Sequence, residues 1–210
     1  MTIDPSKLHF RSAKASDAPL AAPLIYSAAP EVFDFVFGGD RPALLEFLRR
    51  AFANGSGAFG HQRDPVASVD GELVAIGSFY GEEDCPRRDL RGLWTLLRCF
   101  DPARFLRIVR RVGKMRGEMS HADTGTEFMV HFAVQESLRG RGIGSAFLRR
   151  QLDVARAKGR RRYALNVAES NHGARQLYER LGFRVVGETR WMDATPGNPP
   201  PRLKRMELEL

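Results

Sequence analysis

Length, composition and charge narrow the possibilities before any motif is considered. The 210 residues suffice for one well-buried domain and are few for two, and 43% hydrophobic with 28% charged residues excludes a disordered chain. No run approaches the roughly 18 apolar residues of a membrane span, and the amino terminus lacks an apolar export segment, so we expect a cytoplasmic protein. The formal net charge of +8 favours anionic partners without selecting among them.

The cysteines and the basic residues bear on two further classes, metal or disulfide proteins and nucleic-acid-binding proteins. Cys85 and Cys99 have neither the spacing of a disulfide framework nor that of a zinc site, so we expect no metal. The richest basic stretch, from Arg87 to Arg116, alternates with apolar residues as in an amphipathic helix. Because no helix-turn-helix, zinc or stacking-aromatic signature accompanies it, nucleic acid is a weaker candidate partner.

The first third of the chain reads as a strand followed by two helices. Leu8 to Arg11 favours a strand, and Asp17 with Pro19 is typical of a helix start, with apolar residues continuing to Tyr26. A second helix is predicted after Asp40, with one apolar face formed by Leu44, Leu45 and Leu48.

The clearest turn signal lies between two strand-like runs. Residues 66–69 and 73–80 are joined through Asp70 and Gly71, a dipeptide preferred where a tight turn needs positive backbone φ angles. The sequence therefore predicts a β-hairpin here.

A helical insert-like segment is predicted at about 82–125. One helix has its apolar face at Leu90, Leu93, Trp94 and Leu97, and the other has Phe105, Ile108, Val109 and Val112.

The last part of the chain alternates strands and helices. We predict strands at 127–134 and 162–168, helices at 142–158 and 171–181, an extended segment at 183–191 and a closing edge strand at 205–210. The whole chain, 1–210, thus reads as a single mixed α/β domain without internal repeats. An alternating terminal strand at Arg205 to Leu210 would also offer an edge for a homodimer.

The most informative residues form a glycine-rich turn between a predicted strand and the start of a predicted helix. A phosphate cradle needs backbone N–H groups aimed at one point, which glycines permit, and the helix start adds partial positive charge. Flanking arginines can add full charges. A Rossmann dinucleotide site is set aside, because its turn follows the first strand and has a different glycine order. The residues concerned are Arg139, Gly140, Arg141, Gly142, Ile143 and Gly144.

From Phe128 to Val186 the sequence resembles the acetyl-CoA-binding half of the Gcn5-related N-acetyltransferases (GNAT). Their signature arginine, x, x, glycine, x, glycine is matched by Arg139, Gly142 and Gly144. A downstream helix motif of the family is matched by Asn171, Ala174, Leu177, Tyr178, Glu179, Leu181, Gly182 and Phe183. The resemblance implies the GNAT fold, a mixed and mostly antiparallel central sheet flanked by helices. It also implies acetyl-CoA as co-substrate.

The resemblance further implies which residues meet acetyl-CoA. In the family the strand before the turn splays from its neighbour and pairs with the pantetheine arm, which implies the backbone from Phe132 to Val134. The turn residues, together with Ser145, would hold the pyrophosphate, and Asn171 and Tyr178 would contact the arm. The plainer alternatives are that Phe132 and Val134 are core strand residues and that Asn171 is a helix N-cap.

Acetyl transfer needs a proton donor for the leaving thiolate and a base for the attacking amine. The resemblance favours Tyr178 as the donor; the alternative is a tyrosine that packs on the inner helix face. Many relatives use a glutamate as base, and Asn166, which cannot accept a proton, occupies one of its two usual places. The remaining candidates are Glu127 and His131 in the strand before the turn, a residue of the insert-like segment, or bulk water acting on an amine of low pKa. Alternation puts Glu127 and His131 on one face with Met129.

Three functions fit the sequence. The first is acetyl transfer to the primary amine of a small molecule, with the arginines of 87–116 favouring an acidic acceptor. The second is acetylation of a protein amino terminus or lysine, which would need an open peptide groove. The third is a non-catalytic acetyl-CoA-binding or basic interaction module, since a fold does not guarantee chemistry.

Overall fold

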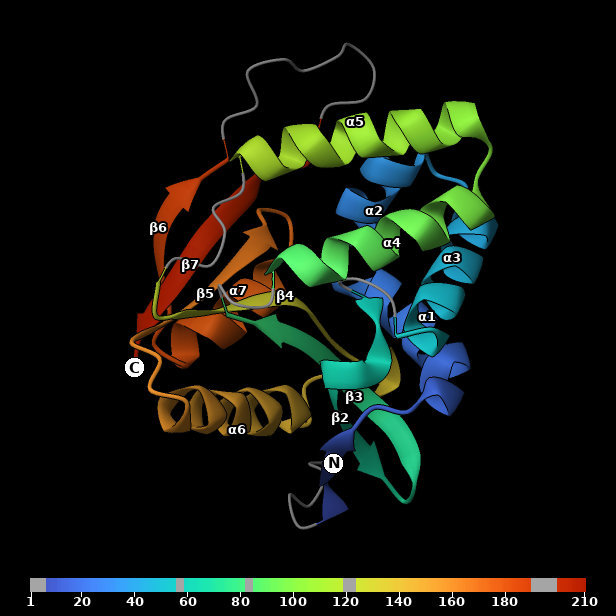
Figure 1. The fold of residues 1–210 in the computed structure, drawn as a ribbon. Helices are drawn as coiled ribbons and strands as arrows, with labels where there is room; N and C mark the ends of the chain where they lie inside the picture. Colours follow the sequence, from blue (N-terminus) through green and yellow to red (C-terminus); the bar gives the residue numbers. More distant parts are fainter. Residues whose placement is uncertain (1–6, 56–58, 82–84, 119–123, 190–199) are drawn as a thin grey trace.

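The computed structural model describes residues 7–55, 59–81, 85–118, 124–189 and 200–210 (Figure 1). The helices are α1 (Ala18–Ala28), α2 (Pro30–Phe37), α3 (Arg41–Ala53), α4 (Cys85–Cys99), α5 (Pro102–Glu118), α6 (Ile143–Ala157) and α7 (His172–Arg180). The strands are β1 (His9–Ser12), β2 (Pro65–Val69), β3 (Glu72–Tyr80), β4 (Thr126–Val134), β5 (Arg162–Ala168), β6 (Arg184–Glu188) and β7 (Leu203–Glu209).

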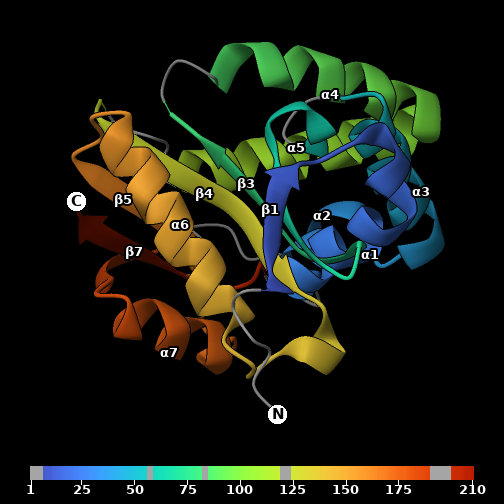
Figure 2. The same cartoon turned by 90° about the horizontal axis from the view of Figure 1, so that it is seen from below.

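All seven strands form one sheet in the order β1-β2-β3-β4-β5-β7-β6. Neighbouring strands are antiparallel except β4 and β5, which run parallel. Helices α6 and α7 cover one face, and α1, α2 and α3 lie on the other (Figures 1 and 2). The predicted mixed sheet flanked by helices is therefore confirmed.

Two apolar clusters, one on each face, hold the layers together. The cluster under α1–α3 includes Ile25, Leu48 and Ile76, and the cluster under α6 and α7 includes Phe147 and Leu165. Each of these side chains is at most 1% exposed. Fully burying one such side chain stabilises a fold by about 1.5–3 kcal/mol, so both faces contribute to the stability of the sheet.

The predicted hairpin is present as β2 and β3. Val69 pairs with Glu72 across the turn, and Asp70 and Gly71 have φ angles of +51° and +85°. Positive φ at both central residues matches the twist of antiparallel strands, which is why aspartate and glycine occur here.

Helix α2 was not predicted. Its segment is rich in valine and phenylalanine, which favour strands by residue type. The helix begins at Pro30, whose fixed φ suits the first turn, and it buries Phe33 and Val36 three positions apart. Burial against neighbouring helices thus overrides local preference.

The apolar face predicted for α4 is wrong. Leu93, Trp94 and Leu97 are 39%, 69% and 49% exposed, and the helix instead buries Thr95 and Leu96. Helix α4 packs mainly against α3, and α5 against α2, so the contacts of the insert are largely with helices. The side chain of Leu90 lies outside the described residues.

The predicted edge strand at 205–210 is also wrong. Strand β7 pairs with β5 on one side and with β6 on the other, so it is internal to the sheet. The two edge strands are β1 and β6. The homodimer predicted through Arg205 to Leu210 therefore has no free strand edge there through which to form.

Among the described residues no single helix has the length and apolar composition needed to cross a membrane. The bent pair Ala15–Ala28 and Pro30–Phe37 meets both criteria only when its two parts are taken together.

Candidate active site

The parallel pairing of β4 with β5 is shorter than either strand. Its last pair is Met129 with Leu165, whereas β4 remains paired with β3 as far as Val134. In the described part of the chain, the facing backbone edges of 130–134 and 166–168 therefore have no strand partner. Such an edge can bind an extended ligand through main-chain hydrogen bonds.

A β-bulge at Val130 reverses the side-chain alternation of β4. The pairing with β3 steps from Met129 to His131 and leaves Val130 as the extra residue. Glu127 and Met129 lie on the α6 face, whereas His131 lies on the α1–α3 face. Beyond the bulge, Phe132 faces α6 again, against Phe147. The prediction that Glu127 and His131 share a face is therefore wrong.

The turn between β4 and α6 contains two glycines with positive φ. Gly140 and Gly142 have φ angles of +73° and +87°, and a Cβ added at either would meet no atom within 4 Å. The space in front of the turn is therefore open. Gly142 is the N-cap of α6 and makes no side-chain cap, so the N–H groups of Ile143 to Ser145 lack intrahelical partners. They carry the partial positive charge of the helix start.

Two other residues of the predicted turn make structural contacts. The Nε of Arg139 donates to the carbonyl oxygen of Val134 at 3.1 Å, which fastens the turn to the end of β4. A Cβ on Gly144 would lie 3.2 Å from Leu177 Cδ2 and 3.7 Å from Phe132. Gly144 thus permits α6, α7 and β4 to approach one another beside the opening, a packing role that the sequence did not show. Arg141 is half-buried nearby.

Asn171 is the N-cap of α7, as its plainer interpretation predicted. Its Oδ1 accepts a hydrogen bond from the backbone N–H of Ala174 at 3.1 Å. His172 beside it is exposed.

Tyr178 lies on the inner side of α7 and is 6% exposed. It belongs to the apolar cluster that contains Met129 and Leu165, the last β4–β5 pair, and its ring centroid lies 5.8 Å from that of Phe183. Burial raises the pKa of the Tyr178 phenol above its ordinary value. The hydroxyl therefore keeps its proton in the free protein, and giving it to a thiolate, whose thiol has a pKa of about 8.5, is uphill.

Glu127 lies at the far end of β4 from the turn. Its two carboxylate oxygens bind Lys158 Nζ at 2.7 Å and Arg160 Nε at 3.0 Å. Both cations come directly after α6 in the chain, so their ion pairs with Glu127 tie the end of that helix to the sheet.

His131 lies beside Asp64, which the sequence analysis did not single out. His131 Nε2 is 3.9 Å from Asp64 Oδ2, both side chains are at most 3% exposed, and the His131 ring stacks on Phe59 at 6.0 Å. Asp64 precedes β2 by one residue and resembles an ordinary turn residue in the sequence. Only the fold brings it to β4.

Asn166 is the first residue of β5 beyond its pairing with β4. Its side-chain Nδ2 is buried and has no hydrogen-bond partner among the described residues. Because Leu165 and Val167 belong to the α6 face, alternation puts Asn166 on the same side of the sheet as His131.

Comparison with known proteins shows the family of the chain. The profile described as the acetyltransferase (GNAT) family matches residues 31–183. The chain belongs to this family. The predicted family, acyltransferase class and acetyl-CoA co-substrate are thereby confirmed, since GNAT members take their acetyl group from acetyl-CoA.

Individual relatives show how far the likeness extends. A mycothiol acetyltransferase from Beutenbergia cavernae is 42% identical over 64 residues, which are 30% of this chain and 22% of that protein. The chain matches about a fifth of the length of such curated relatives.

Solved structures resemble this chain over nearly its whole length. An N-acetyltransferase from Staphylococcus aureus Mu50 has a TM-score of 0.69 at 16% identity, covering 95% of this chain and 100% of that one. An acetyltransferase of Salmonella typhimurium, solved with acetyl-CoA, has a TM-score of 0.55 at 17% identity, covering 97% and 94%. These likenesses establish the shared fold.

Proposed function

We propose that this GNAT protein transfers the acetyl group of acetyl-CoA to the primary amine of a small molecule. The observation that carries the proposal is the opening between β4 and β5, which begins after Met129 and Leu165 and lies beside the glycine turn. One feature suits an extended thioester arm and the other suits a pyrophosphate.

The residues present fit acetyl-CoA. The open face of Gly140 and Gly142 would receive the pyrophosphate, with Arg139, Arg141 and the N–H groups of Ile143 to Ser145 supplying positive charge. The backbone from Phe132 to Val134 would pair with the arm, and Asn171 would meet it from α7. The thioester, when bound, supplies an activated acetyl group.

The acceptor amine would approach from the other face. His131 and Asn166 border the opening on the side of α1–α5, opposite Tyr178. The buried Nδ2 of Asn166 is a donor that a bound acetyl or acceptor oxygen can satisfy. Helices α4 and α5 add 32 residues on this side, 15 and 17 respectively. Their bulk favours a small acceptor over a folded protein.

The proposed roles of the side chains follow from these positions. His131, whose Nε2 lies 3.9 Å from Asp64 Oδ2, accepts the proton that the amine loses as its nitrogen bonds to the acetyl carbon. Tyr178 donates its hydroxyl proton to the sulfur as the carbon–sulfur bond breaks. Glu127 lies on the opposite face from His131 with both oxygens bound to cations, so we propose His131 as the base and a structural role for Glu127.

Binding of acetyl-CoA by Gly142→Ala tests the proposal against a matched control. Gly142 and Gly159 lie at opposite ends of α6, both have positive φ, and a Cβ on either meets no atom within 4 Å. Alanine at each should therefore cost a similar 1–2 kcal/mol or so of backbone strain. We expect calorimetry to show acetyl-CoA binding lost or weakened at least about tenfold in Gly142→Ala, because the methyl group enters the phosphate cradle.

Gly159→Ala should bind acetyl-CoA like the wild type at the same temperature. Equal weakening in both variants would assign the effect to strain in α6 and remove support for the cradle. With binding established, turnover of small amines against peptide amines decides the acceptor class, and faster turnover of a peptide would reject the small-molecule assignment.

A further inference from the structure

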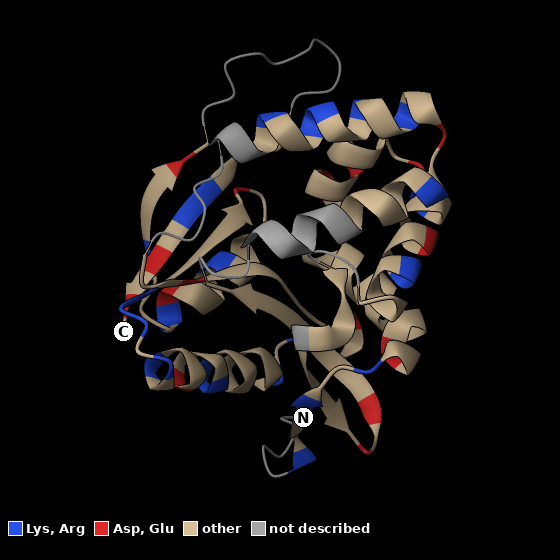
Figure 3. Ribbon diagram, viewed as in Figure 1, with Lys and Arg blue, Asp and Glu red and all other residues tan. Residues whose placement is uncertain are grey.

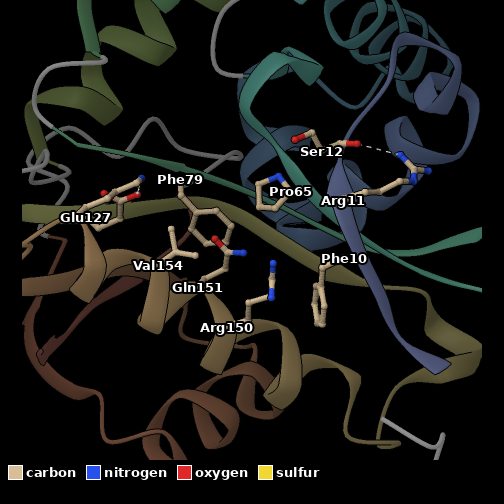
Figure 4. Close-up of a pocket in the computed structure, with 10 residues that line it drawn as sticks. Phe10, Arg11, Ser12, Pro65, Phe79, Glu127, Arg150, Gln151 and Val154 are labelled. Carbon is tan, nitrogen blue, oxygen red and sulfur yellow. Dashed lines mark hydrogen bonds and ion pairs between the residues drawn. The ribbon is translucent and has the colours of Figure 1, made fainter. Parts of the chain in front are cut away.

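A second concave site lies on α6, away from the glycine turn. Its volume is about 740 Å³, and it lies between β1 and the middle and end of α6 (Figure 4). Arg150, Gln151 and Val154 line it from α6, whereas the turn and the first helical residues, 139–145, take no part in it. Arg150 follows Gly142 by eight positions, a distance of roughly 12 Å along a helix.

Two polar groups on α6 converge in this pocket without a hydrogen-bond or ion-pair partner among the described residues. Gln151 is 8% exposed, yet its amide makes no hydrogen bond to any described residue. The guanidinium of Arg150 has no acidic partner in the described parts of the chain and lies 5.0 Å from the Phe10 ring centroid. Figure 4 shows both side-chain ends pointing toward the same space, beneath Pro65.

The other charges around the pocket are already neutralised. Arg11 binds both carboxylate oxygens of Asp17, at 2.7 and 2.8 Å. Glu127 binds Lys158 and Arg160. Arg150 is thus the lining cation available to a ligand, and every lining carboxylate is matched by cations. The pocket therefore favours an anion.

Apolar side chains form the remaining wall. Phe79 is buried at 7% exposure, Val154 is 37% exposed, and Pro65 and Phe10 complete the surface. A hydrated inorganic anion would leave these groups in contact with water. A ligand with an apolar body would cover them and be stabilised by their burial.

We propose that this pocket is a second ligand site, which binds a small monocarboxylate with an apolar body. The guanidinium of Arg150 can donate two parallel hydrogen bonds to the carboxylate, and the Gln151 amide can donate another. The apolar body would rest against Phe79, Pro65 and Val154. This site neither uses nor requires the residues proposed for acetyl-CoA.

Titration of the full chain with phenylacetate, followed by amide NMR, tests the proposal. Phenylacetamide keeps the apolar body without the charge, and inorganic phosphate keeps charge without the body. We expect saturable binding of phenylacetate, with shifts centred on 150–154, and at least about tenfold weaker binding of both controls. Saturating CoA should leave phenylacetate binding unchanged.

Arg150→Gln and Arg149→Gln form a matched pair of variants. Arg149 is an exposed neighbour on α6 that does not line the pocket. We expect phenylacetate affinity to fall at least about tenfold in Arg150→Gln and to be retained in Arg149→Gln. Each of four outcomes would overturn the proposal. These are phenylacetate binding that does not saturate, equal affinity for phosphate, equal loss of phenylacetate affinity in both variants, and displacement of phenylacetate by CoA.

Discussion

Tyr178 and His131 border the opening between β4 and β5 from opposite faces of the sheet. Tyr178 belongs to the cluster under α6 and α7, whereas His131 stacks on Phe59 in the α1–α3 layer. A bulge of one residue, Val130, produces this division. The group that would protonate the leaving thiolate and the group that would deprotonate the amine therefore lie on opposite faces. Neither can take its proton from the other.

Replacing Tyr178 by phenylalanine should lower kcat while leaving acetyl-CoA binding intact. The change removes the hydroxyl and keeps the ring against Phe183. Loss of a general acid costs about 10²–10⁴-fold in rate. Steady-state kinetics with the acceptor found by screening measure kcat, and calorimetry measures the Kd of acetyl-CoA as the control. Unchanged kcat would mean that another group or water protonates the thiolate.

At the scale of elements, α4 presents its apolar stripe to solvent and buries the adjacent residues. Leu96 is 6% exposed and Leu97 is 49% exposed, so neighbouring leucines of one helix occupy opposite environments. The sequence pattern shows that α4 is amphipathic, but the pattern alone does not show what lies beside each face.

Leu96→Ala and Leu97→Ala should therefore have unequal effects on the free energy of unfolding. Leu96→Ala should lower it by about 2–5 kcal/mol, because it removes buried methyl groups and leaves a cavity. Leu97→Ala should change it by no more than about 0.5 kcal/mol, as for other exposed positions. Urea unfolding followed by circular dichroism measures both. Equal losses would mean that the α4 stripe is covered in solution.

Local signals predicted the elements whose geometry is set locally. The Asp70-Gly71 turn and the α6 start at Gly142 both follow from backbone φ requirements, and both are present. The bulge at Val130 could not be predicted, because it depends on the register between β3 and β4, which are separated by the insert. The nearness of Asp64 to His131 depends on the same long-range pairing. The backbone of the glycine turn was therefore predicted, whereas the composition of each sheet face was not.

At the scale of the whole molecule, the excess of basic residues is spread widely. Lys and Arg occur along α5, α6 and β7 (Figure 3), and many of them form ion pairs, such as Lys204 with Glu169 and Glu188. Exposed pairs of this kind contribute at most about 1 kcal/mol each to stability. The net charge of +8 therefore bears more on the binding of anions than on the fold.

Acetyl-CoA binding should weaken as salt rises, and the binding of acetyl-pantetheine should not. Acetyl-pantetheine keeps the thioester arm and lacks the phosphates that the turn and its arginines would hold. The screening length falls from about 10 Å at 0.1 M salt to about 3 Å at 1 M, which weakens the attraction between the phosphates and the turn. The Kd of acetyl-CoA should therefore rise several-fold over that range. Calorimetry at both concentrations measures the two ligands. If the Kd of both ligands responded equally to salt, the phosphates would lie outside the positive field of the turn. Arg141→Gln removes one nearby charge, so it should reduce the salt dependence of acetyl-CoA binding and leave that of acetyl-pantetheine unchanged.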